Sequence, residues 1–362
     1  MRIALLAPKG DFDKAQGEGT LRYMYELYRN MKKVESEYSS CVEKVELPVR
    51  KHLSKRLSFA LGNFFANLGE FDIAHSLTLM PMQNLRSRNT IKFMTIHDFQ
   101  FLLVPELSSD VKRSALKKIW WSRTFLKMPV KISLSSVDYI MVNSTQTRDE
   151  TIEMGFPKER IFVANHGMDE RFISAPLKKK GHVKRFKVGY VGAFRTRKNV
   201  GFAVEAFKML PEKDVVFELW GPPKFEYNML RERVKGDKRI EFKGFAPEKD
   251  LVKIYDSFNA FVFPSSYEGE GLAIIEAQAR GLPVIICKKG RIAKEIRRYC
   301  FEAEDSADMA RIISELKRSG YDAKRRKTAM DYARRFTWKN TARLTLEAYR
   351  KALKEMRGSN LS

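Results

Sequence analysis

The stretch Phe263-Pro-Ser-Ser-Tyr-Glu268-Gly-Glu-Gly271-Leu-Ala-Ile-Ile-Glu276-Ala-Gln-Ala-Arg-Gly-Leu-Pro283-Val decides the fold class of this chain. An apolar run over 260–263 predicts a β-strand, which must end at Pro264 because proline has no N–H to give to a sheet. A loop with two glycines follows, helical spacing begins near Leu272, and residues 283–287 predict the next strand. Strand, loop, helix and strand in this order are typical of a parallel α/β sheet.

The same alternation of strand and helix patterns runs through the whole chain on both sides of this stretch. It is broken once, over 174–186, where a polar and basic segment with Pro and Gly predicts a linker. The sequence of 362 residues therefore predicts two α/β domains. Ligands of open α/β sheets bind at the carboxyl ends of the strands, so we expect a site in the cleft between the two domains.

The composition limits the classes of protein to consider. Lys and Arg number 68 against 44 Asp and Glu, and the net charge of +24 predicts an anionic partner, although solubility in a lysine-rich proteome would also explain it. No apolar run approaches the roughly 18 residues of a membrane-spanning helix, and the first residues predict a strand rather than a signal peptide. Three cysteines without a CxxC pair favour a reducing, cytoplasmic compartment.

The glycine loop and the helix after it predict an anion site. Gly269 and Gly271 allow a ligand to come close to the backbone, and the free N–H groups at the helix start favour negative charge. Glu276 lies one turn into that helix, where it can accept hydrogen bonds from a sugar hydroxyl, and Glu268 lies in the loop before it. The alternative is that both are exposed acids favoured by the helix dipole.

A second loop, which follows the predicted strand over 187–191, is basic. Arg195, Arg197 and Lys198 lie where a diphosphate would need positive charge, and a solvated basic loop is the alternative interpretation. The loop is neither a GxGxxG fingerprint nor a Walker A loop, because neither pattern occurs here.

Together, the two segments resemble the C-terminal domain of the retaining glycosyltransferases of family 4, the group 1 glycosyltransferases with the GT-B fold. The resemblance rests on the spacing of Glu268 and Glu276, which matches that family's Glu-x7-Glu motif, and on several shorter motifs: Arg197-Lys198-Asn199, Lys243-Gly-Phe245, Thr95-Ile-His97-Asp98, Asn165-His-Gly167, and Gly17 with Gly19. It implies two Rossmann-like domains that face each other across a cleft. An acceptor-binding domain would comprise 1–180 and, through a C-terminal helix that crosses back, 338–362; a donor-binding domain would comprise 184–337.

The resemblance also implies an activity. The enzyme would move a hexose from a nucleoside diphosphate sugar to a hydroxyl of a glycan, glycolipid or lipid-linked acceptor, with retention and without a metal or other cofactor. The expected catalytic residues are His97, which would face the reacting sugar, Lys198, and Glu268, which would hold hydroxyls of the donor sugar. The expected donor-binding residues are Glu276 at the ribose, either Arg195 or Arg197 at the diphosphate, the backbone at Gly271 and Leu272, and Gly17, Gly19 and Phe245.

Two departures and two rival interpretations remain open. Glu270 and Ala273 stand where the family often has Phe and Pro, so we expect the Glu270 side chain to point outward, and Ala193 stands where many members have Arg.

An epimerase or hydrolase of the same fold would use other carboxylates. A basic protein that binds nucleic acid or a membrane without catalysis would explain the charge, but no nucleic-acid-binding signature occurs, so nucleic acid is not an expected partner.

A basic, aromatic stretch and a lone histidine are two further features of the sequence. The stretch 111–131 interleaves Lys and Arg with Trp120, Trp121 and Phe125, a pattern that fits a helix on an anionic membrane and equally a helix packed on the sheet. Such a helix would make the enzyme peripheral on the cytoplasmic face of a membrane. A lone histidine at a strand end, His75, favours a structural role.

Overall fold

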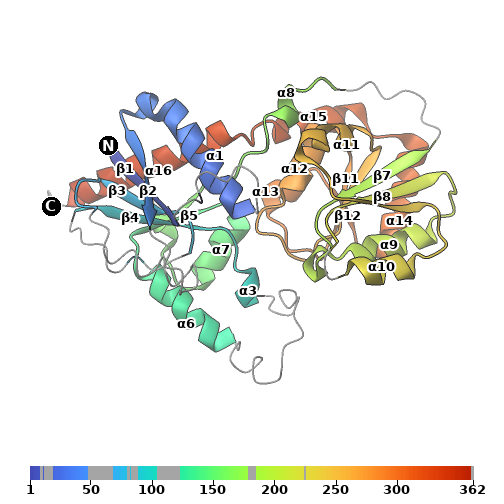
Figure 1. Ribbon diagram of the computed structural model, residues 1–362, viewed down its shortest axis with the longest axis horizontal. Coiled ribbons are helices and arrows are strands. Elements are labelled where there is room, and N and C mark those ends of the chain that lie inside the picture. The colour runs from blue at the N-terminus through green and yellow to red at the C-terminus, as the bar shows by residue number, and fades with distance from the viewer. Residues whose placement is uncertain are drawn as a thin grey trace. The chain divides into compact units, whose positions relative to one another are not determined.

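The computed structural model describes residues 1–8, 11, 19–47, 68–79, 82, 89–103, 123–177, 185–223 and 226–359 (Figure 1). The chain divides into two compact units. The first comprises Met1–Leu102, Ser114–Gly167 and Thr337–Ser362, and the second comprises Leu103–Arg113 and Met168–Phe336. Each unit contains a six-stranded sheet with helices packed on it, and each is described by itself.

The sheet of the first unit has the strand order β2-β1-β3-β4-β5-β6, and all paired neighbours run parallel. The chain enters at β1, adds β2 on one side and then continues with β3 on the other, so its direction of growth reverses between β1 and β3. The strands are β1 (Arg2–Pro8), β2 (Cys41–Leu47), β3 (Ile73–Ser76), β4 (Ile91–Ile96), β5 (Tyr139–Val142) and β6 (Ile161–Val163).

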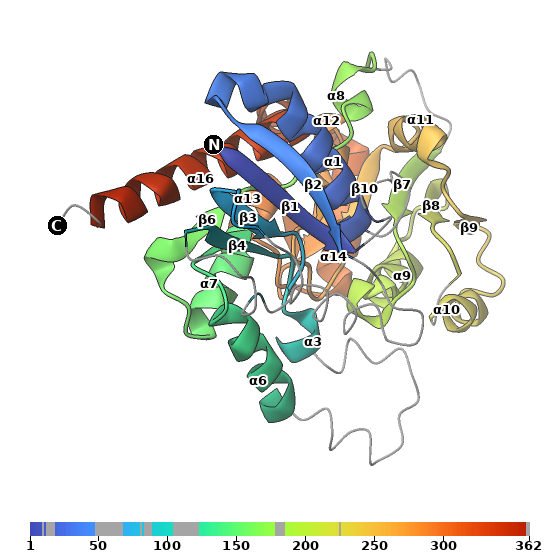
Figure 2. The same ribbon diagram turned by 60° about the vertical axis from the view of Figure 1, so that its left-hand side comes forward.

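Two long helices, α1 (Gly19–Val34) and α16 (Trp338–Ser359), lie side by side on this sheet although they are far apart in the sequence (Figures 1 and 2). Both are amphipathic: Leu27 and Met31 of α1 and Leu346 and Tyr349 of α16 share one apolar core with the strands. Between β1 and β6, the described residues form the further helices η1 (Glu35–Tyr38), α3 (Gln100–Leu103), α6 (Arg123–Leu134), α7 (Thr145–Glu153) and η2 (Lys158–Arg160).

The sheet of the second unit has the order β12-β11-β10-β7-β8-β9, again with parallel neighbours. This is the doubly wound order of a Rossmann-like fold, and the direction reverses between β7 and β10. The strands are β7 (Phe186–Val191), β8 (Val215–Trp220), β9 (Ile240–Gly244), β10 (Ala260–Phe263), β11 (Val284–Cys287) and β12 (Phe301–Ala303).

Helices cover both faces of this second sheet, which is why its central strands are apolar throughout. In β10, Ala260 and Val262 pack into the core under α9 and α14, while Phe261 and Phe263 pack into the core under α11 and α12 (Figure 1). The helices are α8 (Arg171–Ser174), η3 (Thr196–Lys198), α9 (Val200–Met209), α10 (Tyr227–Arg233), η4 (Glu248–Asp250), α11 (Leu251–Asp256), α12 (Leu272–Ala279), α13 (Lys294–Arg297), α14 (Ser306–Ser319) and α15 (Ala323–Ala333).

The chain leaves the first unit after Gly167, before the expected linker at 174–186, and it returns to this unit at Thr337. Residues 168–177 lie with the second unit because Phe172 is buried in its core, and because the buried Arg280 donates hydrogen bonds to the carbonyls of Phe172, Ala175 and Pro176. The first unit thus ends about a dozen residues before the expected boundary at residue 180.

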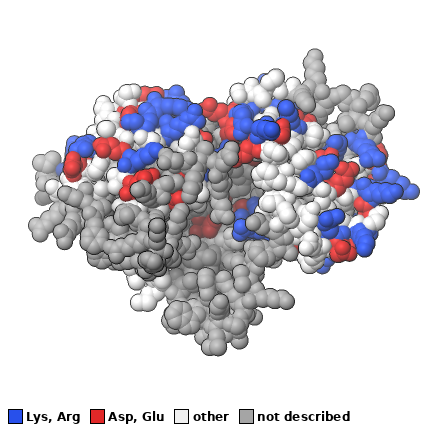
Figure 3. Space-filling model, viewed as in Figure 1, with Lys and Arg blue, Asp and Glu red and all other residues white. Residues whose placement is uncertain are grey.

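The charge of the chain does not gather in one patch on the face shown in Figure 3. There, Lys and Arg atoms lie interspersed with Asp and Glu atoms over the part of the surface that the structure describes. None of the helices in the described ranges combines the length and apolar character that crossing a membrane requires.

Candidate functional site

The two loops singled out in the sequence leave neighbouring strands of the second unit. β7 pairs directly with β10, with Val188 opposite Ala260, so the loop over 192–199 and the loop over 264–271 emerge side by side at the carboxyl edge of the sheet. The sheet changes direction between these two strands, and that is the place where open α/β sheets bind their ligands. The topology therefore brings both predicted anion-binding segments to one location.

The first loop follows a path that its small residues permit. A Cβ at Gly192 would lie 2.8 Å from Oη of Tyr190, so a side chain there would collide with the ring. The Tyr190 hydroxyl instead donates a hydrogen bond to the carbonyl of Ala193, at 2.9 Å. Asn199 has a φ of 49°, the left-handed conformation that Asn tolerates better than most residues, and it turns the chain from Lys198 directly into α9.

Backbone groups fasten the two loops to each other. The Ser266 amide donates to the Arg197 carbonyl at 2.8 Å, and Arg197 Nη1 donates to the Tyr267 carbonyl at 3.3 Å. The amide of Glu268 in turn donates to the carbonyl of Arg291, at 2.9 Å. These contacts fix the positions from which the charged side chains of both loops extend.

The centre of the site is a carboxylate shared by two cations. Oε1 of Glu268 lies 2.5 Å from Nη1 of Arg197 and 2.7 Å from Nζ of Lys198. Glu268 is only 6% exposed, and Lys198 also lies 4.9 Å from the ring centroid of Phe263. Two positive charges against one negative charge leave the cluster with an excess of one positive charge, which favours an anionic ligand.

Burial and charge shift the pKa values of this cluster. Desolvation pulls the pKa of Lys198 below its usual value against the attraction of Glu268. For Glu268, burial acts to raise the pKa, but the charges of Lys198 and Arg197 outweigh it and hold the pKa below the usual value. Glu268 is therefore ionised at neutral pH, and the three side chains form a charged cluster.

The start of α12 provides a second feature that suits an anion. Its N-cap residue, Gly271, has a φ of 87°, a conformation that L side chains rarely adopt. The first N–H groups of an α-helix have no acceptor within the helix, and together with the dipole they attract negative charge. Glu270, which we expected to point outward, is 8% exposed, so that expectation is wrong.

Glu276 lies within α12 and is buried, as is its partner Tyr255 at the end of α11. The Tyr255 hydroxyl donates to Oε2 of Glu276 at 3.0 Å. Desolvation, together with the neighbouring charge of Glu276, raises the pKa of Tyr255 well above its usual value, so this phenol stays protonated. Tyr255 was not identified from the sequence, because it precedes Glu276 by 21 residues with no motif around it.

The remaining expected site residues lie elsewhere in the two units. Arg195 is the N-cap of η3 and stands close enough for its charge to act on Lys198, so both arginine candidates for the diphosphate lie near that lysine. Leu272 opens α12, and Phe245, 66% exposed, follows β9. Gly17 lies outside the described residues, as does the part of 111–131 that precedes Arg123.

In the first unit, His97 follows β4, and its Nε2 lies 3.1 Å from the carbonyl oxygen of Leu77. Gly19 is the first residue of α1, and His97 lies edge-on to Tyr23 of the same helix, at 4.8 Å between ring centroids. His166 stacks on Tyr23, at 4.5 Å between ring centroids, and lies 5.4 Å from the ring of His97. The sequence motifs that carry His97 and His166 thus converge on one cluster of rings.

The residue His75 lies in the interior of the first unit and joins three elements. Its Nδ1 contacts the Tyr349 hydroxyl of α16, and its Nε2 lies 2.8 Å from Oγ1 of Thr95, which in turn lies 3.0 Å from the Tyr23 hydroxyl. Burial, followed by the charge of His97, lowers the pKa of His75 to about 3, so the ring is neutral at ordinary pH. These contacts are those of a structural residue.

Comparison with known proteins agrees with this arrangement. Residues 174–336 match the family model for glycosyl transferases group 1. O-antigen chain mannosyltransferase B of Escherichia coli is 26% identical over 274 residues, which cover 71% of this chain and 69% of that protein.

Solved structures share the fold over almost the whole chain. Sucrose-phosphate synthase from Thermosynechococcus elongatus superposes with a TM-score of 0.71 at 18% identity, over 98% of this chain and 100% of the other. HepE from Anabaena, solved in complex with UDP and glucose, superposes with a TM-score of 0.66 at 17% identity, over 97% and 100%.

The fold is that of the GT-B enzymes, with two Rossmann-like α/β units. Most of the second unit, residues 174–336, matches the model of the group 1 glycosyltransferases, and together with the similarity to a mannosyltransferase over 71% of the chain this identifies the protein as a glycosyltransferase.

Proposed function

We propose that this glycosyltransferase moves a hexose from a nucleoside diphosphate sugar to a hydroxyl of a glycan, glycolipid or lipid-linked acceptor, with retention at the anomeric carbon. The observation that carries the proposal is the cluster of the half-buried Arg197 and Lys198 around the buried Glu268, at the carboxyl edge of the second sheet. The similarity to a mannosyltransferase supports a hexose as the transferred group, and the UDP found in HepE supports a nucleotide-linked donor.

The parts of this site match the parts of such a donor. The diphosphate would lie between the cations and the N-terminus of α12, where Gly271 and Leu272 offer backbone N–H groups. Glu276, held by Tyr255, would accept hydrogen bonds from the ribose hydroxyls. Glu268, fixed on Arg197 and Lys198, would hold hydroxyls of the donor sugar.

The two cations also suit the chemical step. When the bond between the anomeric carbon and the diphosphate oxygen breaks, negative charge grows on the leaving nucleoside diphosphate, while the acceptor oxygen bonds to that carbon and passes its proton to an oxygen of the leaving diphosphate. Arg197 and Lys198 would stabilise this charge from fixed positions. We therefore propose that the reaction needs no metal ion, and that His97 faces the reacting sugar from the first unit.

The helix α6 favours an acceptor at an anionic lipid surface. Met128 is 67% exposed and Ile132 is 40% exposed, and their spacing of four residues puts them on one side of the helix. Lys127 and Lys131 are exposed beside them. Apolar side chains flanked by lysines are typical of helices that lie at the interface of an anionic membrane. We propose that the enzyme binds such a surface peripherally, on the cytoplasmic side.

The experiment that tests the function begins with a thermal-shift screen of nucleoside diphosphate sugars, because a bound donor raises the apparent stability. The donor selected in this way is then incubated with and without a lipid-linked acceptor, in the presence of EDTA. We expect transfer that depends on the acceptor and survives EDTA. Loss of transfer with EDTA and its return with manganese would disprove the metal-free mechanism. Turnover of the donor without any acceptor would instead support an epimerase or hydrolase.

A further inference from the structure

A small pocket lies at the amino edge of the second sheet, opposite the candidate donor site. Phe186 is the first residue of β7, Asn259 directly precedes β10, and Pro283 directly precedes β11, so all three mark the starts of neighbouring strands. The helix side of the pocket is closed by Leu316 of α14, by Tyr321, which lies between α14 and α15, and by Arg326 of α15. Its volume is about 170 Å³, below the roughly 300 Å³ of the smallest pockets that hold drug-sized ligands.

Two polar atoms in the lining are buried without a hydrogen-bond partner among the described residues. They are Nε of Arg326 and the hydroxyl oxygen of Tyr321. No ion pair joins the Arg326 guanidinium to a described carboxylate, and none of the residues that line the pocket is Asp or Glu. A guanidinium is always charged, and a buried donor without an acceptor costs free energy, so this arrangement favours an acceptor from outside the chain.

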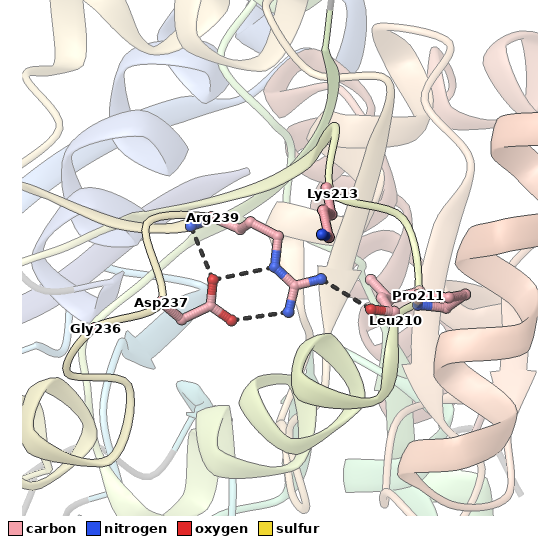
Figure 4. Close-up of a pocket in the computed structure, with 6 residues that line it drawn as sticks. All are labelled: Leu210, Pro211, Lys213, Gly236, Asp237 and Arg239. Carbon is pink, nitrogen blue, oxygen red and sulfur yellow. Dashed lines mark hydrogen bonds and ion pairs between the residues drawn. The ribbon is translucent and has the colours of Figure 1, made fainter.

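Other arginines of the same unit show how the chain treats a guanidinium that it uses structurally. Figure 4 shows Arg239 in a shallow pocket near the start of β9, where it is forked against Asp237 at 3.0 and 2.8 Å and donates to the Leu210 carbonyl at 2.8 Å. Arg280 is likewise forked against Asp256, at 2.7 and 2.9 Å. Arg326 differs from both because its pocket offers it no carboxylate.

The other polar groups of the pocket are also suited to donate. Burial raises the pKa of Tyr321 to about 12, so its hydroxyl stays protonated at neutral pH. Asp322 follows Tyr321 in the sequence and is the N-cap of α15. Its carboxylate accepts a hydrogen bond from the Arg325 amide. Arg325 itself stacks on Phe301 and donates to the Cys300 carbonyl. Arg326 and Tyr321 therefore remain as the lining residues with a buried polar atom that has no partner among the described residues.

We propose that this pocket binds a small oxyanion, such as inorganic phosphate or a short carboxylate, between Arg326 and Tyr321. A guanidinium and a phenol supply two or more donors to one oxyanion, and Asn259 adds a side-chain amide on the strand side. The apolar walls from Phe186, Pro283 and Leu316 limit competition from water. The volume admits an anion of a few heavy atoms and excludes a nucleotide sugar, so this site is distinct from the candidate donor site.

The test is a titration of the full chain with inorganic phosphate, and separately with acetate, at an ionic strength kept constant with chloride. Thermal shift and calorimetry follow binding. The variants are Arg326→Gln, Arg326→Lys and Tyr321→Phe, with Arg318→Gln as the matched control because Arg318 is exposed on α14 and does not line the pocket. Lys198→Gln is a further variant. We expect it to weaken phosphate binding at the candidate donor site, so that binding there can be told apart from binding in the pocket.

We expect saturable stabilisation of the wild type, of Arg318→Gln and of Lys198→Gln. The affinity should fall at least tenfold in Arg326→Gln and a few-fold in Tyr321→Phe, and Arg326→Lys should retain part of it. A response to acetate alone would assign the site to carboxylates, and a response to phosphate alone to phosphate. The proposal is overturned if neither anion stabilises the wild type, or if Arg326→Gln responds as the wild type does. Neither outcome bears on sugar transfer, which is measured separately.

Discussion

Nζ of Lys198 lies 2.7 Å from Oε1 of Glu268, and the two side chains come from loops that follow neighbouring strands of the second sheet. The same carboxylate oxygen also holds Arg197, at 2.5 Å. Glu268 therefore keeps two cations in place before any ligand arrives. A diphosphate that enters this site meets charges that are already positioned, and the cost of arranging them is borne when the protein folds.

Replacement of Glu268 by Gln should destabilise the protein, because it leaves two half-buried cations without their buried counter-ion. The loss of one partner of a buried ion pair costs about 3–5 kcal/mol in the free energy of unfolding. A nucleoside diphosphate should restore more stability to this variant than to the wild type, since its charge replaces the lost carboxylate. Urea denaturation with and without the nucleotide measures both effects.

The matched control is Glu304→Gln, which removes an exposed carboxylate paired with Lys288. Exposed pairs contribute about 0–1 kcal/mol, so this variant should unfold nearly as the wild type does. If Glu268→Gln is as stable as Glu304→Gln, the cluster is not the buried charge centre described above.

Replacement of Lys198 by Ala should act mainly on turnover. Its charge is needed most when the diphosphate departs, so kcat should fall on the order of a hundredfold or more while KM for the donor changes less. Steady-state kinetics with the donor selected by thermal shift measure the two constants. Lys253→Ala, which removes an exposed lysine of α11, is the control and should leave both unchanged. An equal loss in the two variants would exclude a specific role for Lys198.

Replacement of Glu276 by Ala should weaken nucleotide binding, whatever sugar is attached. A hydrogen bond to a charged group contributes about 1.5–3 kcal/mol, which corresponds to a roughly tenfold or greater rise in Kd. Tyr255→Phe should weaken binding less, since it leaves the carboxylate in place and removes only its 3.0 Å hydrogen bond. Calorimetry with the free nucleoside diphosphate and with its sugar gives the Kd values.

The Kd values of Glu276→Ala for the free nucleoside diphosphate and for the nucleoside diphosphate sugar together decide this prediction. If Glu276→Ala weakens the binding of the nucleotide sugar but not that of the free nucleotide, the carboxylate contacts the sugar and not the ribose. If neither Kd changes, Glu276 is a structural partner of Tyr255 and the assignment to the donor fails.

Much of the fold follows from local patterns in the sequence. The strand over 260–263 and the helix from Leu272 occur where the apolar run and the glycine loop predict them, because strand, turn and helix signals are local. Local patterns do not reveal β2 (Cys41–Leu47) and β12 (Phe301–Ala303), which are the edge strands at one end of each sheet. Edge strands carry charged residues such as Glu43 and Glu302, so the apolar run that marks a central strand is absent from them.

The pairing of side chains across the site could not be predicted in the same way. Lys198 and Glu268 are 70 residues apart, and they meet only because β7 and β10 are neighbours in the sheet. The sequence indicated that both loops suit an anion, but not that Glu268 lies on the cations or that Tyr255 holds Glu276. The roles of these residues toward a donor, and the choice between Arg195 and Arg197, stay predictions.

Acidification should destabilise the first unit through His75. Its pKa is about 3 in the folded state, against 6.5 for an unperturbed histidine, so the unfolded state binds one more proton between these values. The free energy of unfolding should then fall by about 1.4 kcal/mol for each pH unit below 6.5 on account of this group. Hydrogen exchange of the amides of β3 and β4 between pH 7 and pH 5, corrected for intrinsic rates, measures the slope.

His75→Gln removes the titrating group and should reduce the slope by about one proton. Tyr349→Phe is the control: it removes the hydroxyl that contacts His75 but leaves the buried ring, so the slope should persist. Equal slopes in the wild type and in His75→Gln would show that His75 is protonated in the folded state or is not responsible.

Reversal of two charges on α6 should reduce binding to anionic vesicles. Each lysine near an anionic surface contributes about 1 kcal/mol, so the loss of the attraction of Lys127 and Lys131 lowers partitioning about 30-fold, and their replacement by Glu lowers it further. Sedimentation of the full chain with vesicles of phosphatidylglycerol and phosphatidylcholine measures the partition coefficient. Binding of the wild type should also fall steeply as salt is added.

Two further variants separate attraction at this helix from the general effect of the net charge of +24. Lys235→Glu with Lys238→Glu makes the same change of charge on an exposed loop of the second unit, and it should leave most of the binding intact. Met128→Ser with Ile132→Ser removes the exposed apolar side chains, and it should lower the part of the binding that persists at high salt, because burial of apolar surface is not screened by ions. If the α6 variant and the control lose binding equally, the membrane attracts the charge of the whole chain, and α6 has no particular part in it.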